Sequence, residues 1–267
     1  MYPTLIDFGP FAIHSFGFMI MLGFLTATWL MRKEFERKGI DPELASNVGI
    51  AAIIGGFIGA RIYFILERPS EFMADPAGMI FSGAGLVWYG GFIGGFAAVI
   101  WIIKRSGTPI LAAGDTIMPL LVLGYAIGRI GCQLAGDGDY GPPSDVPWAM
   151  AYPEGVVPTT ERVHPTPVYD TLLAGSFFAM IWLNRFRMTK MGVAMGWGMV
   201  AMGVERFITE FFRTTPVVFA GLTLAQIISL FTMTAGLYLV FRESEEYSEG
   251  AALQKPTSKP KKKKASR

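Results

Sequence analysis

The feature that most constrains this chain is a series of apolar runs, each about as long as the roughly 20 residues that cross a bilayer core as a helix. Because little chain remains between them, the sequence predicts an all-α polytopic membrane protein with seven transmembrane helices, in one domain over residues 1–242. The runs are Phe11–Met31, Val48–Leu66, Leu86–Ile103, Ile110–Ala135, Pro167–Leu183, Met191–Phe212 and Val217–Phe241.

Composition supports this class and excludes others. Charged residues make up 16% of the 267 residues and hydrophobic residues 52%, whereas an average soluble domain is about 25% charged. The chain has one cysteine and two histidines, too few for a disulfide framework or a Cys/His zinc cluster. We therefore expect no metal and no cofactor, and no nucleic acid among the partners.

The basic residues predict the orientation of the helices. The first run has no Lys or Arg before it and is followed by Arg32, Lys33, Arg37 and Lys38, which places the N-terminus outside by the positive-inside rule. Alternating the connections then puts seventeen of the 23 Lys and Arg residues inside. The C-terminus is cytoplasmic in this scheme, and residues 243–267, rich first in Glu and Ser and then in Lys and Pro, form a disordered basic tail.

Glycines recur at four-residue spacing on several runs. In lipid such stripes let helices approach closely, so they predict a compact bundle, and we expect a monomer. The pairs are Gly55 and Gly59, Gly90 and Gly94, Gly91 and Gly95, Gly124 and Gly128, and Gly192 and Gly196.

Several ionisable side chains lie inside the predicted spans, where each costs about 3 kcal/mol even on lenient insertion scales. In the predicted topology they fall toward the outer face: Arg61, Arg129, Asp170, Glu205, Arg206 and Glu210. They could be interhelical salt bridges or a functional site. Helical spacing allows Glu210 to pair with Arg206 or Arg213. Asp115, near the inner end of the fourth span, is expected to be structural.

Arg129 favours the functional interpretation. It stands where the fourth span becomes the Gly- and Asp-rich turn of residues 136–141, and irregular backbone at membrane depth is tolerated only in protein or beside a watery cavity. The planar fork of an arginine there suits a phosphate, such as that of a lipid headgroup. The outer loop, residues 136–166, carries Trp148 and Tyr152, and we expect it to lie on the membrane interface as a lid.

Taken in order, short motifs along the chain resemble the bacterial prolipoprotein diacylglyceryl transferase family. The similarity runs from Gly9 to Phe241 and rests on the ordered set of motifs. They are Gly9–Gly17, Gly55–Arg61, Trp88–Gly94, Gly128–Gly131 with the turn that follows, Arg162–Asp170, Glu205 with Arg206, and Glu210–Arg213.

This resemblance implies a membrane enzyme of the bacterial inner membrane. It would transfer the diacylglyceryl group of phosphatidylglycerol to the lipobox cysteine thiol of a prolipoprotein signal peptide, forming a thioether and releasing glycerol phosphate. Arg129 and Arg213 would face the phosphate and Arg206 would support them. The motifs add further substrate-binding candidates, namely Arg61, Glu210, His14, Gly90 and Gly91.

The sequence departs from the family pattern at the position of the base. Tyr89 stands where the best-studied members have His, and a phenol with a pKa near 10 is a poor base at neutral pH. The candidate bases are therefore Tyr89, His164, Asp137 and Asp139. Other departures are Phe16 for Tyr, Cys132 for Asn and Asp170 for Glu; Cys132 is expected to be a small apolar residue rather than a nucleophile.

Two other functions remain open from the sequence. Tyr89 and Cys132 would fit an enzyme of the same fold with a different acceptor. The paired intramembrane charges would fit an ion-coupled transporter, although the chain has no similarity between its halves and its charges lie toward one face.

Overall fold

The computed structural model describes residues 1–9, 11–81 and 87–247, which are mostly helical. Four helices are long and apolar enough to cross a membrane: α1 (Ser15–Arg37), α2 (Glu43–Glu67), α6 (Ile110–Ala135) and α9 (Leu224–Phe241). The other long helices are α5 (Trp88–Ser106), α7 (Thr166–Asn184) and α8 (Val193–Thr209). Each predicted run therefore overlaps a long helix, and the fold is consistent with an all-α membrane protein.

Three small hairpins interrupt the helical pattern. They pair β1 (Thr4–Asp7) with β2 (Ala12–His14), β3 (Met150–Tyr152) with β4 (Thr159–Val163), and β5 (Val217–Phe219) with β6 (Leu222–Thr223). The first and last apolar runs were thus predicted to begin too early, and α1 continues to Arg37, beyond the predicted end at Met31. The last helix begins only after Thr223, which forms a capping box with Gln226.

The described chain divides into two compact units. Residues 32–113 form one and residues 1–31 with 114–247 form the other. The first contains α2 and α5, with the short helices α3 (Pro69–Ala74) and α4 (Pro76–Phe81) between them.

Glycines bring α2 and α5 into close contact, as their spacing predicted. A Cβ added to Gly59 would lie 2.3 Å from the Gly90 carbonyl oxygen, and one added to Gly55 would lie 2.7 Å from that of Gly94. Side chains at these positions would force the backbones apart, so glycine is required for this packing. Gly128 does not follow the pattern, because nothing lies within 4 Å of a Cβ built there.

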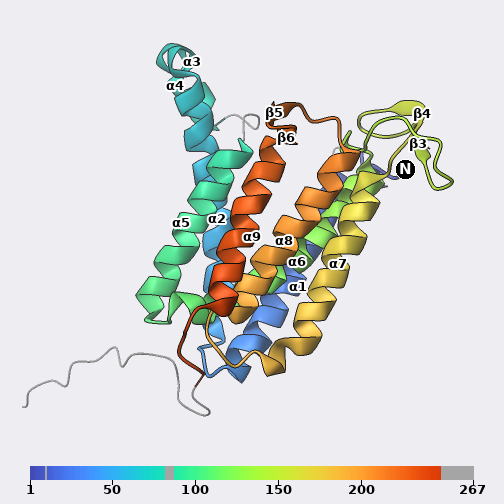
Figure 1. Cartoon of the computed structure of the whole chain (residues 1–267). Coiled ribbons are helices and arrows are strands. Elements are labelled where there is room, and N and C mark those ends of the chain that lie inside the picture. Colours follow the sequence, from blue (N-terminus) through green and yellow to red (C-terminus); the bar gives the residue numbers. More distant parts are fainter. Residues whose placement is uncertain (10, 82–86, 248–267) are drawn as a thin grey trace, which may run out of the picture. The chain divides into compact units, whose positions relative to one another are not determined.

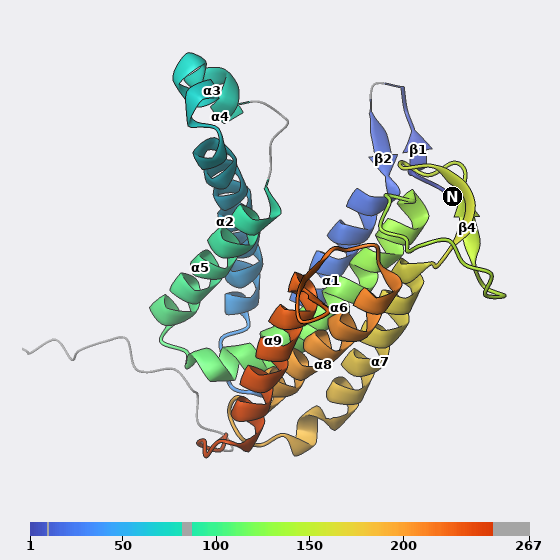
Figure 2. The same cartoon turned by 45° about the horizontal axis from the view of Figure 1, so that its top comes forward.

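The larger unit is built around α6. In its apolar segment 44% of the residues are buried, compared with 17% for the other three candidate spans. Figures 1 and 2 show α1, α7, α8 and α9 packed with it in one bundle. Val122 and Ala126 of α6 meet Ala174 of α7 in a buried core, and α8 packs on α9 where Gly196 faces the Gly236 carbonyl.

Asp115 joins α6 to the start of α8. Its carboxylate accepts hydrogen bonds from the backbone N–H groups of Gly192 and Met195, both at 2.7 Å, and from the Tyr247 hydroxyl at 2.6 Å. A carboxylate is favourable at a helix N-terminus, so Asp115 has the structural role expected of it. Tyr247 also bonds Thr189 through its backbone N–H at 2.8 Å; the rest of the predicted tail, residues 248–267, lies outside the described chain.

Candidate active site

The candidate site lies where three segments of the larger unit meet. They are the C-terminal end of α6 with the loop after it, the first turns of α7, and the end of α8 with the 3-10 turn η2 (Glu210–Phe212). Figure 1 shows these ends at one end of the bundle, beside the β3–β4 hairpin. The segments supply Arg129, Asp139, Asp170 and Arg213, which we call the arginine cluster.

In the arginine cluster each arginine contacts both aspartates. Arg129 donates from Nε to Asp170 Oδ2 at 2.6 Å and from a terminal nitrogen to Asp139 Oδ2. Arg213 donates to Asp139 Oδ1 and to Asp170 Oδ2, each at 2.7 Å. The two carboxylates therefore clamp the two guanidinium groups together, and charge-assisted bonds of this kind are short and strong.

Burial distinguishes the members of the cluster. The Asp170 side chain is fully buried and those of Arg129 and Arg213 are 11% and 10% exposed, while that of Asp139 is 35% exposed. Two positive and two negative charges cancel formally, which reduces the cost of holding arginines away from water. Asp139 is therefore the most exposed member of the cluster.

Glycines shape the loop that carries Asp139. Gly136 and Gly138 have φ of 60° and 92°, a region that favours glycine. Gly141 passes so close to η2 that an added Cβ would lie 2.1 Å from the Phe212 carbonyl oxygen. The Thr166 hydroxyl donates to the Asp139 carbonyl and fixes its backbone. The Gly- and Asp-rich turn noted in the sequence is therefore what brings Asp139 to Arg213.

His164 lies beside the cluster in an aromatic group. Its ring centroid is 5.3 Å from that of Phe212, which precedes Arg213. Its Nδ1 is 3.0 Å from the Tyr169 hydroxyl, which in turn accepts a bond from Trp148 Nε1 at 2.7 Å. The hydrogen bond at Nδ1 holds the imidazole in place.

The other charges at the end of α8 and in η2 lie next to the arginine cluster, since Glu205 interacts with Asp170. Arg206 and Glu210 pair at 2.8 Å, as their spacing allowed, but the Arg213 side chain turns to the aspartates. Glu205 is fully buried and accepts bonds from the Tyr125 and Thr209 hydroxyls, both at 3.4 Å. These contacts fit the structural interpretation of Glu205, Arg206 and Glu210.

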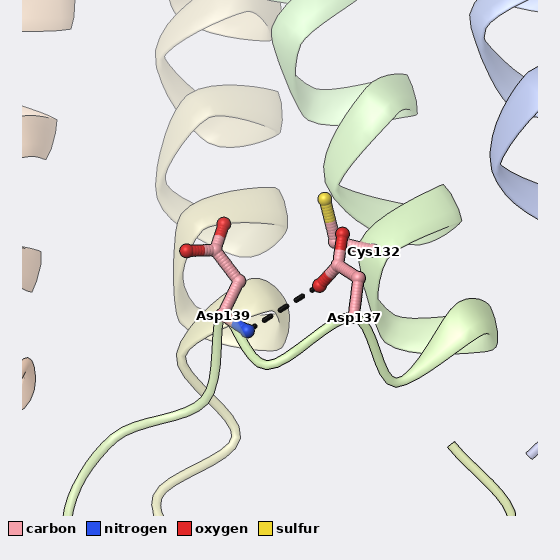
Figure 3. Close-up of side chains that lie close together, drawn as sticks. All are labelled: Cys132, Asp137 and Asp139. Carbon is pink, nitrogen blue, oxygen red and sulfur yellow. Dashed lines mark hydrogen bonds between the residues drawn. The ribbon is translucent and has the colours of Figure 1, made fainter. Parts of the chain in front are cut away.

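Cys132, Asp137 and Asp139 lie close together, with their ligand atoms within 4.8 Å of one another (Figure 3). Asp137 accepts the Asp139 backbone N–H at 3.4 Å. The Asp139 carboxylate, however, is bonded to both arginines, whose positive charges oppose a cation there. We therefore assign Asp139 to the arginine cluster rather than to a metal site.

The outer loop is anchored by its own hairpin. Arg162 donates to the carbonyls of Pro147 and Ala149 at 3.2 and 3.0 Å, and the Tyr152 hydroxyl donates to Gln133 of α6 at 2.9 Å. Burial raises the pKa of Tyr152 to about 12, because its phenolate would lose contact with water. Trp148 is 59% exposed, as an interfacial side chain would be.

The remaining sequence-predicted residues belong to other parts of the chain. Arg61, Tyr89, Gly90 and Gly91 belong to the smaller unit, where Gly90 packs against Gly59 of α2 and Tyr89 is exposed. His14 lies on β2 and contacts the Thr4 hydroxyl at 3.4 Å.

Sequence reasoning missed the role of Asp170. It was one of several charges inside the spans, yet it bonds both arginines. The available signal was its position near the start of α7, because an acidic residue in an apolar helix needs a cationic partner at its own depth.

Comparison with known proteins adds independent findings. A family model described as prolipoprotein diacylglyceryl transferase matches residues 3–242. The chain is 32% identical to a Clostridium tetani protein named phosphatidylglycerol–prolipoprotein diacylglyceryl transferase, over 90% of this chain and 96% of that protein. Proteins of the same name from Shewanella oneidensis and Chromohalobacter salexigens are 31% and 30% identical, over 90% and 96% of this chain and 95% and 97% of theirs.

Proposed function

The chain belongs to the prolipoprotein diacylglyceryl transferase family, and from this membership we propose that it transfers the diacylglyceryl group of phosphatidylglycerol to a prolipoprotein cysteine. The cysteine sulfur attacks the diacylglyceryl carbon that carries the phosphate oxygen. A C–S thioether bond forms, the C–O bond breaks, and glycerol phosphate leaves with the oxygen. The thiol proton passes to a base.

The observation that carries this proposal is the convergence of Arg129 and Arg213 at one point. The phosphate carries one negative charge as a diester and gains a second as it leaves. Two preorganised guanidinium groups in a site poor in water favour the more highly charged state. Electrostatic stabilisation of this kind often supplies most of the rate enhancement of an enzyme.

Asp137 is the base that the contacts favour. Asp139 is engaged by two arginines. The Tyr169 hydroxyl accepts from Trp148 and can donate its own proton to His164 Nδ1, which leaves the imidazole proton on Nε2. Asp137, two residues before Asp139, has a partly exposed carboxylate bonded to a backbone N–H. Its carboxylate also faces the Cys132 thiol, but among the described residues neither arginine of the cluster bonds it, so it can accept a proton beside the phosphate site.

Arg129→Ala and Arg213→Ala test the assignment of the phosphate site. Each should reduce transfer of labelled diacylglyceryl to a lipobox peptide by about a thousandfold, the scale of losing one donor to a developing anion. Arg187→Ala is the matched control, because Arg187 is exposed at the other end of α7. Normal turnover in both site variants would refute the assignment.

The same assay separates the candidate bases. We expect Asp137→Asn to lower kcat more than Tyr89→Phe, His164→Ala or Asp139→Asn does. In Asp137→Asn itself the KM for the lipid should change little. A larger loss of kcat in any of the other three would move the base to that residue. Complementation of a transferase-depleted bacterium by the wild type distinguishes a prolipoprotein acceptor from a different one.

We also propose the finer organisation that the sequence predicted. The protein crosses the bacterial inner membrane seven times, as a monomer, with its N-terminus periplasmic and residues 243–267 cytoplasmic. Support comes from the helix that overlaps each apolar run and from the asymmetry of the basic residues. This topology places the arginine cluster near the periplasmic headgroups.

A further inference from the structure

We propose that the Asp139 carboxylate is an internal stand-in for the phosphodiester, holding both arginines until the lipid headgroup displaces it. This inference rests on the proposed function and concerns what Asp139 does before the lipid binds. It makes Asp139 a competitor of the lipid and hence a determinant of lipid affinity.

The bonding pattern of Asp139 is that of a bound anion. Its two oxygens reach one arginine each: Oδ2 accepts from Arg129, and Oδ1 accepts from Arg213 at 2.7 Å. The two non-bridging oxygens of a phosphodiester can accept the same pair of bonds, because guanidinium groups bind carboxylates and phosphates with similar geometry. The lipid phosphodiester and the Asp139 carboxylate would therefore compete for the same hydrogen-bond donors.

The two arginines need a negative partner when no lipid is bound. Without Asp139, two guanidinium groups would face the single carboxylate of Asp170, and the cluster would hold an uncompensated positive charge with little access to water. Exchange of the Asp139 carboxylate for a phosphodiester, each carrying one negative charge, leaves the formal charge on the arginines balanced throughout.

Position explains why Asp139, rather than Asp170, is displaced. Asp170 is fully buried on α7, whereas the Asp139 side chain is 35% exposed. The Asp139 carbonyl is bonded by Thr166, so rotation of the side chain alone can release the arginines. Two glycines with positive φ, Gly136 and Gly138, form the turn that carries it.

Arg213 also has a donor to spare. Its Nε is buried and has no hydrogen-bond partner among the residues that the structure describes. A buried N–H without an acceptor is unfavourable by about 1–3 kcal/mol. A phosphate offers more acceptor sites than a carboxylate, so it can satisfy the bonds that Asp139 makes and this one too.

Asp139→Asn tests the proposal, because it preserves the shape of the side chain and removes the competing charge. The full-length protein is assayed with phosphatidylglycerol diluted into neutral lipid, and retention of phosphatidylglycerol is measured separately by native mass spectrometry. We expect the KM for the lipid to fall about tenfold and retention to rise in parallel, the scale of losing one charge-assisted bond. Retention of diacylglycerol, which has no phosphate, should not change.

Asp145→Asn is the matched control, since Asp145 is an exposed acidic residue of the same loop; it should leave both quantities at the wild-type value. An unchanged or higher KM in Asp139→Asn, with the thermal unfolding midpoint unchanged, would overturn the proposal. So would an equal rise in retention of diacylglycerol. If the wild type transfers no lipid yet Asp139→Asn retains more phosphatidylglycerol than the wild type, the proposed function is wrong and the role of Asp139 stands. If the wild type transfers lipid normally and Asp139→Asn binds phosphatidylglycerol no more tightly, the proposed function stands and the role of Asp139 is wrong.

Discussion

At the scale of single residues, the proposed site depends on a few charges and their partners. Arg129, on α6, and Arg213, after η2, would repel each other if Asp139 and Asp170 did not lie between them. Of the two carboxylates, Asp170 is the one that stays in place, because it is fully buried. It therefore sets the spacing of the guanidinium groups whether or not a lipid is bound.

Replacement of Asp170 by Asn should consequently impair both stability and turnover. Removing one partner of a buried ion pair destabilises a fold by about 3–5 kcal/mol, and we expect kcat/KM to fall about a hundredfold because the arginines lose their alignment. Asp170→Glu should restore most of the activity, since it retains the charge. Thermal unfolding and the transfer assay measure the two effects.

Asp115→Asn distinguishes loss of stability from loss of function. Asp115 is also a buried acidic residue, but it bonds the start of α8 and Tyr247 rather than an arginine. The variant should unfold at a lower temperature, while the folded fraction keeps its kcat/KM. A similar loss of kcat/KM in Asp115→Asn and Asp170→Asn would show that the effect of Asp170 is only structural.

At the scale of elements, close packing depends on the absence of side chains. The contacts between α2 and α5 and between α8 and α9 are made by glycines facing backbone carbonyls, as at Gly59 and Gly196. Association of helices in lipid relies on such contacts because no hydrophobic effect drives it. The spacing of glycines therefore predicts contact, although Gly128 shows that it predicts it only where a partner helix is present.

Gly59→Ala should destabilise the smaller unit. The added Cβ would lie 2.3 Å from the Gly90 carbonyl oxygen, so α2 and α5 must separate, which costs about 1–3 kcal/mol. Gly56→Ala is the control, because its Cβ would make an ordinary 3.6 Å contact. Equal unfolding midpoints for the two variants in the same detergent would contradict this account.

At the scale of the whole molecule, the proposed orientation rests on the distribution of basic residues. On a Cys132→Ala background, Glu154→Cys in the outer loop and Arg187→Cys beyond α7 introduce exposed thiols on opposite sides of the predicted membrane. A membrane-impermeant maleimide should label position 154 in cells with a permeabilised outer membrane and position 187 only after lysis. The reverse pattern would invert the topology.

Much of the fold and part of the site could be predicted from the sequence. Each of the seven apolar runs overlaps a helix, and α6 has the predicted bounds Ile110–Ala135, because burial in lipid requires apolar, internally hydrogen-bonded segments. The strand Ala12–His14 and the hairpin of Val217–Phe219 with Leu222–Thr223 were missed, since short strands and helix ends have the same apolar composition. The choice of Arg129 and Arg213 rested on their chemistry and on resemblance, whereas their shared partners came from the structure.

The sequence by itself determined the helical membrane class and the residues that can carry chemistry, because lipid imposes length, composition and scarcity of charge locally along the chain. Only the tertiary structure decided which charges meet. Asp139 and Asp170 are separated in sequence from Arg213 by 74 and 43 positions, and pairing at such separations depends on how α6, α7 and α8 end together. The same packing leaves the Asp139 side chain partly exposed, as the proposed exchange with a phosphate requires.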